Sequence, residues 1–276
     1  MLDVEAFKEN ERLAWNLCAE RYDRCLTPFF APFCEKLIAL CQLKRGQKVL
    51  DTATGSGLAA FLSSPLVGPQ GRVVGTDLSD TMIQLARKRA SAESLNNVEF
   101  LQMDAERLDF PSESFDAVLC ALGLMLFPAP DKALSEMYRV LRTDGVVALS
   151  VFGRGSKVAL RALMEPFIPY MPPPSQRGPS TFGFGHSEVL EEALKKARFS
   201  EITTEQELHV LTFGDVEDVW QMLLSLGRLG QMHSRLSPEA QEELKRGVWQ
   251  IAGDKYADPR GAIELPFEIA YALARK

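Results

Sequence analysis

The chain has 276 residues, of which 46% are hydrophobic and 25% are charged, and its formal net charge is −6 at pH 7. This composition is typical of a globular protein and excludes a chain that is mainly disordered. The acidic balance argues against a protein that binds nucleic acid through bulk electrostatics. The length fits one large domain, or one domain with additions.

Neither a targeting signal nor a membrane span is predicted. Residues 1–11 alternate acidic and apolar side chains, and the longest uncharged run, residues 117–130, is too short to cross a bilayer. The five cysteines form no CxxC pair, which favours reduced, buried thiols over a metal site. We therefore expect a cytoplasmic protein without a metal.

The predicted elements begin with helices. Leucines and Phe33 recur at helical spacing in residues 1–45, and Pro28 and Pro32 interrupt them, which predicts two helices with a bend. From residue 48 short, β-branched apolar runs alternate with amphipathic helices, which predicts a parallel, doubly wound α/β sheet. The predicted strands here are 48–53, 72–78, 98–103, 115–121 and 146–152, and the predicted helices are 80–94 and 131–141, with a turn at Asp144-Gly145.

After residue 152 the pattern is less regular. A proline-rich stretch at 171–179 separates predicted elements that surround the sheet. The predicted helices are 157–170, 187–197, 216–229 and 239–252, and the predicted strands are 202–213 and 263–273. Two helices are thus expected between the last two strands.

A glycine-rich turn follows the first predicted strand. Residues 55–60, Gly-Ser-Gly-Leu-Ala-Ala, satisfy the dinucleotide-binding pattern GxGxxG/A. The glycines allow a tight turn and a close approach of the backbone to a ligand, and the next helix offers its N-terminus to an anion. Asp77, at the end of the second strand, fits a carboxylate that accepts both hydroxyls of a ribose. These features suit either an NAD(P) or an S-adenosylmethionine site.

The position of Asp51 distinguishes between these two classes of cofactor. It lies at the carboxyl end of the first predicted strand, four residues before Gly55, where its charge would repel a pyrophosphate. The same carboxylate is favourable beside an ammonium. S-adenosylmethionine carries a ribose, an ammonium and a carboxylate but no phosphate, so it fits both acids and the glycine turn.

Four segments resemble motifs of the class I S-adenosylmethionine-dependent methyltransferases, in the right order and spacing. They are residues 49–57 (an apolar pair and D-x-x-x-G-x-G), 74–87, 103–116 and 133–145. The set is similar to the subgroup of ubiquinone and menaquinone C-methyltransferases. Two positions depart from the subgroup: Thr54, where glycine or cysteine is frequent, and Thr143-Asp144, where Pro-Gly is common.

This resemblance implies the fold and the organisation of the chain. We expect a Rossmann-like, doubly wound, seven-stranded and mostly parallel sheet with an antiparallel last strand and helical lid additions. The expected parts are a helical cap at 1–45, an S-adenosylmethionine-binding core at 46–152, a lid segment at 153–186, and the rest of the core at 187–276 with lid helices at 215–256.

The resemblance also implies which residues bind the cofactor. Asp51 would orient the methionine ammonium, Asp77 would accept from the ribose diol, and Asp104 from the adenine amino group. Thr54 would add a hydroxyl near the methionine end. The full expected set is Tyr22, Asp51, Thr52, Ala53, Thr54, Gly55, Gly57, Asp77, Leu78, Met82, Asp104, Ala105, Glu106, Ala121 and Leu122. S-adenosylhomocysteine would be the product.

No catalytic residue follows from the sequence. Methyl transfer from a sulfonium requires alignment and exclusion of water, and a base only where the acceptor must lose a proton. His186 could approach the pocket, although a role at the start of its helix is favoured. His209 is expected to be structural, His233 could line the lid, and Glu106 would lie close to the adenine.

Aromatic and methionine side chains outside the motifs favour an apolar acceptor pocket. They are Phe29, Phe30, Phe127, Met164, Phe167, Met171, Phe182, Met222 and Met232. We expect methyl transfer to a small, hydrophobic or aromatic molecule, at carbon or oxygen rather than nitrogen, with homo-oligomers possible. Two alternatives stay open: an NAD(P)-dependent oxidoreductase, and a protein that binds the cofactor without transferring a methyl group.

Overall fold

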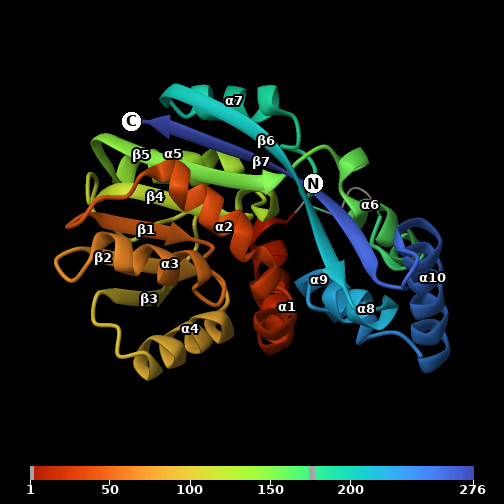
Figure 1. Cartoon of the computed structure of the whole chain (residues 1–276). Coiled ribbons are helices and arrows are strands. Elements are labelled where there is room, and N and C mark those ends of the chain that lie inside the picture. The colour runs from red at the N-terminus through yellow and green to blue at the C-terminus, as the bar shows by residue number, and fades with distance from the viewer. Residues whose placement is uncertain (1–2, 174–177) are drawn as a thin grey trace.

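The computed structural model describes residues 3–173 and 178–276, and its centre is one seven-stranded sheet in the order β3-β2-β1-β4-β5-β7-β6 (Figure 1). Strand β7 is antiparallel to both of its neighbours, and the other pairs are parallel. The predicted α/β class and the antiparallel last strand are confirmed. The strands are β1 (Lys48–Thr52), β2 (Arg72–Asp77), β3 (Val98–Gln102), β4 (Phe115–Ala121), β5 (Leu141–Phe152), β6 (Ser200–Phe213) and β7 (Ile263–Arg275).

The central strands are buried because helices cover the sheet. Leu50 on β1 and Val118 on β4 are register partners, and both side chains are fully buried. Residues 117–120 of β4 form a continuous run of buried apolar side chains, which is characteristic of parallel strands that are covered on both faces. The covering helices are α2 (Thr27–Cys41), α3 (Leu58–Val67), α4 (Asp80–Ala92), α5 (Pro130–Val140) and α7 (Ser187–Lys196).

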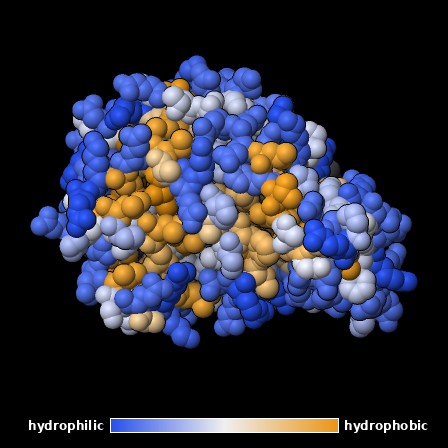
Figure 2. All heavy atoms as spheres, in the orientation of Figure 1, coloured by the Kyte–Doolittle hydropathy of each residue, from blue (hydrophilic) through white to orange (hydrophobic). Residues whose placement is uncertain are grey.

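The surface differs between the core and the added helices. In the orientation of Figure 1, hydrophobic atoms gather over α2 and α3, where Leu40, Leu58 and Leu62 are partly buried (Figure 2). Hydrophilic atoms dominate around α10 (Pro238–Tyr256). No helix within residues 3–173 and 178–276 is long and apolar enough to cross a membrane.

The N-terminal region forms the two predicted helices. Asp3 caps α1 (Val4–Cys25) by accepting a hydrogen bond from the Ala6 amide, and α2 begins directly afterwards at Thr27. Pro28 lies in the first turn of α2, where its missing N–H costs no hydrogen bond. Helix α1 stands beyond the carboxyl ends of β1 and β4 and contacts α4 and α9 (Gly227–His233) (Figure 1).

The predicted helix at 157–170 is wrong as a continuous element. The segment consists of a 3-10 turn at Gly155–Lys157, α6 (Ala159–Leu163) and a second 3-10 turn at Glu165–Tyr170. Pro166 and Pro169 lack the N–H groups that a continuous α-helix needs there. The turn expected at Asp144-Gly145 lies inside β5, where Asp144 has a positive φ and the pairing with β4 shifts register.

The predicted helix at 216–229 is also wrong. It divides into α8 (Val216–Leu224) and α9, so three helices and not two lie between β6 and β7. Gly227 and Gly230 let α9 approach α1: a Cβ atom would lie 2.9 Å from Trp15 and 2.6 Å from the Cys18 Sγ atom. The break lies at Leu226, whose backbone is extended, and α9 then packs against α1 through these two glycines.

Candidate functional site

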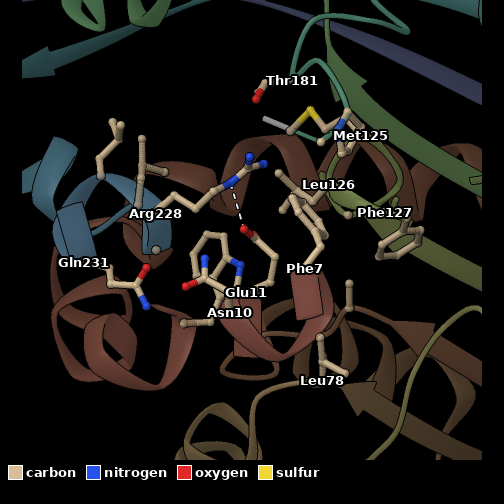
Figure 3. A pocket seen from close by; sticks show the side chains of 18 of the residues that line it. Phe7, Asn10, Glu11, Leu78, Met125, Leu126, Phe127, Thr181, Arg228 and Gln231 are labelled. Carbon is tan, nitrogen blue, oxygen red and sulfur yellow. Dashed lines mark ion pairs between the residues drawn. The ribbon is translucent and has the colours of Figure 1, made fainter. Parts of the chain in front are cut away.

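A cavity of about 950 Å³ lies at the carboxyl ends of the central strands. One side, the strand wall, comes from segments after β1 to β4: Ala53, Gly55, Asp77, Leu78, Met103 to Glu106, Ala121 and Leu122. The opposite side, the helix wall, includes Phe7, Lys8, Asn10, Glu11, Trp15, Leu226 to Leu229, Gln231, Met232, Arg235 and Leu236 (Figure 3). This volume is at the upper end of the range for a pocket that holds one drug-sized molecule, so it has room for a cofactor and a second ligand.

Most of the residues expected to bind the cofactor meet at this cavity. Eleven line it: Tyr22, Ala53, Gly55, Asp77, Leu78, Met82, Asp104, Ala105, Glu106, Ala121 and Leu122. Asp51 and Thr54 line an adjoining cavity of about 30 Å³, which shares Tyr22, Ala53, Ala121 and Leu122 with the larger one. The fold therefore assembles residues that are up to 100 positions apart in the sequence.

Asp51 is a fully buried carboxylate at the end of β1. One oxygen, Oδ2, accepts a hydrogen bond of 2.5 Å from the Thr54 hydroxyl, whereas Oδ1 has no hydrogen-bond partner among the described residues. Burial raises the pKa of Asp51 to about 7, although the hydrogen bond from Thr54 opposes this shift. A buried carboxylate oxygen without a partner fits the ammonium of the expected cofactor. Thr54, which differs from the residue that is frequent in the subgroup, holds this carboxylate in place through its hydrogen bond.

Asp77 connects the carboxyl end of β2 to the glycine turn after β1. Its Oδ2 accepts a hydrogen bond of 2.9 Å from the Gly55 amide, and its Oδ1 accepts one of 2.8 Å from the Ser79 amide. Burial raises the pKa of Asp77, and these backbone hydrogen bonds counteract the rise. Each carboxylate oxygen can accept a second hydrogen bond, so Asp77 retains the capacity to bind two ribose hydroxyls.

Thr52 and Gly57 face neither cavity. The Thr52 hydroxyl donates to the Leu119 carbonyl at 3.1 Å, inside the sheet. Gly57 has a φ of +95°, and a Cβ atom there would lie 2.6 Å from the Phe61 ring. Thr52 therefore contacts β4 within the sheet, and Gly57 allows the turn to pack against Phe61. Direct contact of either residue with a cofactor stays a prediction.

Lys8 is a charged residue that the sequence analysis missed. Its Nζ lies 2.7 Å from Asp104 Oδ2 and 2.5 Å from Glu106 Oε2, so α1 is tied to the loop after β3. Burial opposes the charge, but the interactions with the two carboxylates outweigh it and raise the pKa of Lys8. Glu106 also accepts from the Ala129 amide at 2.7 Å. A single lysine in an N-terminal helix gives no signal in the sequence for this role.

An ion pair between the buried Glu11 and the partly exposed Arg228 joins α1 to α9 at the cavity. The Arg228 Nε atom lies 2.8 Å from Glu11 Oε1, and Figure 3 shows the two side chains meeting between the helices. Burial raises the pKa of Glu11, and the charge of Arg228 opposes the rise. Residues 7, 11, 15 and 22 of the helix wall recur at helical spacing, so a search for a lining face of α1 could have found Glu11.

The aromatic and methionine residues expected at the pocket divide into two groups. Phe30, Phe127, Met164, Met171 and Met232 line the cavity. The other four pack elsewhere: Phe29 stacks on Phe213, Phe167 on Trp220, Phe182 packs beside Phe152, and Met222 is buried in the core. Residue type alone therefore does not distinguish the side chains that line the cavity from those that pack elsewhere in the protein.

No described histidine lines the cavity. His186 occupies the N-cap position of α7 but makes no side-chain capping bond. His209 Nε2 lies 3.2 Å from the Tyr271 hydroxyl on the neighbouring strand, as expected of a structural residue. The His233 ring packs against Trp220 with 5.2 Å between centroids. Of the four candidate bases, only Glu106 borders the cavity.

The sequence matches known proteins over the part that builds the strand wall. Residues 49–145 match the family described as "Methyltransferase domain". The chain is 35% identical over 131 residues to the ubiquinone/menaquinone biosynthesis C-methyltransferase UbiE of Coxiella burnetii (strain RSA 493), covering 47% of this chain and 52% of UbiE. It is 32% identical over 166 residues to the aklanonic acid methyltransferase DauC of Streptomyces sp. (strain C5), covering 59% of this chain and 76% of DauC.

The chain belongs to the class I S-adenosylmethionine-dependent methyltransferases. The match spans about half the length of UbiE. A solved structure of the protein BH2331 from Bacillus halodurans C-125 is similar as well, with a TM-score of 0.61, 25% identity, and coverage of 88% of this chain and 98% of that one. S-adenosylmethionine is the cofactor of this methyltransferase family, and an NAD(P)-dependent oxidoreductase is not favoured.

Proposed function

We propose that this chain transfers a methyl group from S-adenosylmethionine to a small, hydrophobic or aromatic acceptor, at carbon or oxygen rather than nitrogen. The observation that supports this most is that the larger cavity has motif residues on its strand wall and largely apolar residues opposite. The names of two relatives, a C-methyltransferase of ubiquinone/menaquinone biosynthesis and an aklanonic acid methyltransferase, point the same way.

Each part of the site has a proposed task. The bound cofactor would supply a methyl group that is already activated on sulfur. Asp51 would hold the ammonium through its partnerless oxygen, Asp77 the ribose diol, and Asp104 the adenine amino group. Phe30 and Phe127 would exclude water around the acceptor and align it, which accounts for much of the rate of such a transfer. We assign no catalytic base.

The proposal extends to organisation and location. We propose that residues 1–45 act as a cap, 46–152 as the cofactor-binding core, and 153–186 and about 215–256 as a lid. A cytoplasmic location is supported by the five cysteines, all of which are free thiols. A nucleic-acid partner is disfavoured by the net charge of −6.

Cofactor binding tests the first half of this proposal. Isothermal titration should show micromolar binding of S-adenosylhomocysteine. Asp77→Ala removes charge-assisted hydrogen bonds to the ribose and should weaken binding about 100-fold. The matched control is Asp254→Ala, which removes an exposed carboxylate on α10, outside the cavity. Absence of binding, or equal binding by the wild type and Asp77→Ala, would refute the assigned site.

An assay of methyl transfer tests the second half of the proposed function. The protein is incubated with S-adenosylmethionine labelled in its methyl group and with a metabolite extract, and label is then measured in the fraction that partitions into organic solvent. We expect label to enter that fraction, and to be lost with Asp77→Ala. Binding without transfer to any fraction would support the alternative of a cofactor-binding protein that does not methylate.

A further inference from the structure

The charged residues around the cavity are unevenly distributed. Carboxylates dominate the strand wall, where Asp77, Asp104 and Glu106 lie. The helix wall carries two arginines of the described part of the chain, Arg228 and Arg235. The described side chains of the helix wall, Lys8, Glu11, Arg228 and Arg235, thus carry a net positive charge, whereas those of the strand wall carry a net negative charge.

Arg235 differs from Lys8 and Arg228, two other cations that line the cavity. Lys8 is paired with Asp104 and Glu106, and Arg228 is paired with Glu11. Within residues 3–173 and 178–276, the Arg235 guanidinium has no carboxylate within 4.0 Å and no hydrogen-bond partner. It is also exposed while lining the cavity, which places it at the cavity mouth.

Apolar residues close to Arg235 in the sequence also line the cavity. Met232 and Leu236, on either side of it in the sequence, both line the cavity, and Leu229 is the next lining apolar residue toward α8. A guanidinium above an apolar surface suits a carboxylate attached to a hydrophobic body, because its planar fork binds both carboxylate oxygens. The sulfonium and ammonium of the cofactor would be attracted to the opposite, acidic wall.

We infer that the methyl acceptor carries a carboxylate, which Arg235 binds at the cavity mouth while the apolar body of the acceptor contacts the helix wall. This inference rests on the proposed function and names the substrate class of that site. Arg235 would then recognise the acceptor on the side of the cavity opposite the strand wall, where the cofactor would present its methyl group.

Two matched aromatic probes test it. 2-Naphthoate and its uncharged isostere 2-naphthamide are titrated into the protein saturated with S-adenosylhomocysteine, and binding is followed by quenching of Trp15, which lies in the helix wall. We expect the carboxylate to bind about tenfold more tightly than the amide. Arg235→Gln should abolish this difference. Trp15→Phe should remove the signal, which shows that the quenching comes from the cavity.

Arg260→Gln is the matched control, because the Arg260 side chain is 92% exposed and lies outside the cavity. It should retain the preference for the carboxylate. Equal binding of the two probes by the wild type, or an unchanged preference in Arg235→Gln, would overturn the inference. A loss of S-adenosylhomocysteine affinity in Arg235→Gln would also overturn it, since Arg235 would then bind the cofactor carboxylate. If the wild type binds no S-adenosylhomocysteine at all, it is the proposed function that fails.

Discussion

Asp51 is a residue whose burial opposes folding and whose carboxylate we propose for cofactor binding. Its carboxylate is fully buried, and the oxygen Oδ1 has no partner within the described part of the chain. Burial raises its pKa from the ordinary 3.8 to about 7. Because this pKa is higher in the folded protein than in the unfolded chain, the folded state binds more protons between these two values. The free energy of unfolding therefore falls as the pH rises from about 4 to about 7.

Asp51→Asn should consequently stabilise the protein without ligand at pH 8 and change it little at pH 4, where Asp51 is already protonated. The melting temperature measured by differential scanning calorimetry should rise by a few degrees at pH 8, at about 2–4 °C per kcal/mol. The same variant should bind S-adenosylhomocysteine more weakly, because the ammonium loses its counter-charge. Asp254→Asn, at an exposed site, is the control. A variant that is destabilised equally at both pH values would contradict this account.

At the scale of elements, α1 forms part of the helix wall of the cavity. It is attached to the loop after β3 through Lys8, and to the start of α4 through Arg12 and Asn16, which lie 2.9 and 2.7 Å from Asp80 Oδ1. The Lys8 side chain is 13% exposed and that of Glu106 is 2% exposed. Removing one partner of such a buried ion pair leaves an uncompensated charge and costs about 3–5 kcal/mol.

Lys8→Met should therefore lower the free energy of unfolding by about 3 kcal/mol, measured by urea titration at pH 7. The amides of α1 should also exchange hydrogen faster than in the wild type. The double variant Lys8→Met with Glu106→Gln should recover part of the loss, because the buried charge of Glu106 is removed as well. If the double variant is as unstable as the sum of the two single variants, the ion pair does not hold α1 in place.

At the scale of the molecule, the long antiparallel pair β6–β7 extends past the carboxyl ends of the parallel strands, and α8, α9 and α10 lie there (Figure 1). Glu268, which is 3% exposed on β7, anchors this pair of strands to the segment after β5. Its Oε1 lies 2.6 Å from Arg154 Nη2 and 3.4 Å from Lys157 Nζ, and its Oε2 accepts from the Arg154 amide at 3.0 Å. The hydrogen bonds from Arg154 hold the pKa of Glu268 at about 2, although burial opposes this.

A pKa lowered from 4.5 to about 2 means that Glu268 stabilises the folded state above pH 4.5, and that this stabilisation is lost as the pH falls toward 2. Glu268→Gln should lower the melting temperature by a few degrees at pH 7. The difference from the wild type should shrink as the pH falls from 4.5 to 2. Melting curves between pH 2 and 8 measure this, and a difference that is independent of pH would contradict it.

The sequence by itself determined the fold class and most of the strand wall. Asp51, Gly55 and Asp77 lie at strand ends beside a glycine turn, so neighbouring residues dictate their positions, and local pattern is sufficient to place them. The helix breaks at 157–170 and 216–229 were missed: Pro166 and Pro169 interrupt the first, and the second lies at the extended residue Leu226, after which α9 packs against α1.

Only the tertiary structure decided the helix wall. Glu11 meets Arg228 and Lys8 meets Asp104 across separations of 217 and 96 residues, and no local spacing encodes such pairs. Nor does composition show that Phe30 lines the cavity while Phe29, its neighbour, packs against Phe213. The reason is physical: strand ends and turns follow from adjacent residues, whereas the side of a helix that lines a cavity depends on everything packed around it.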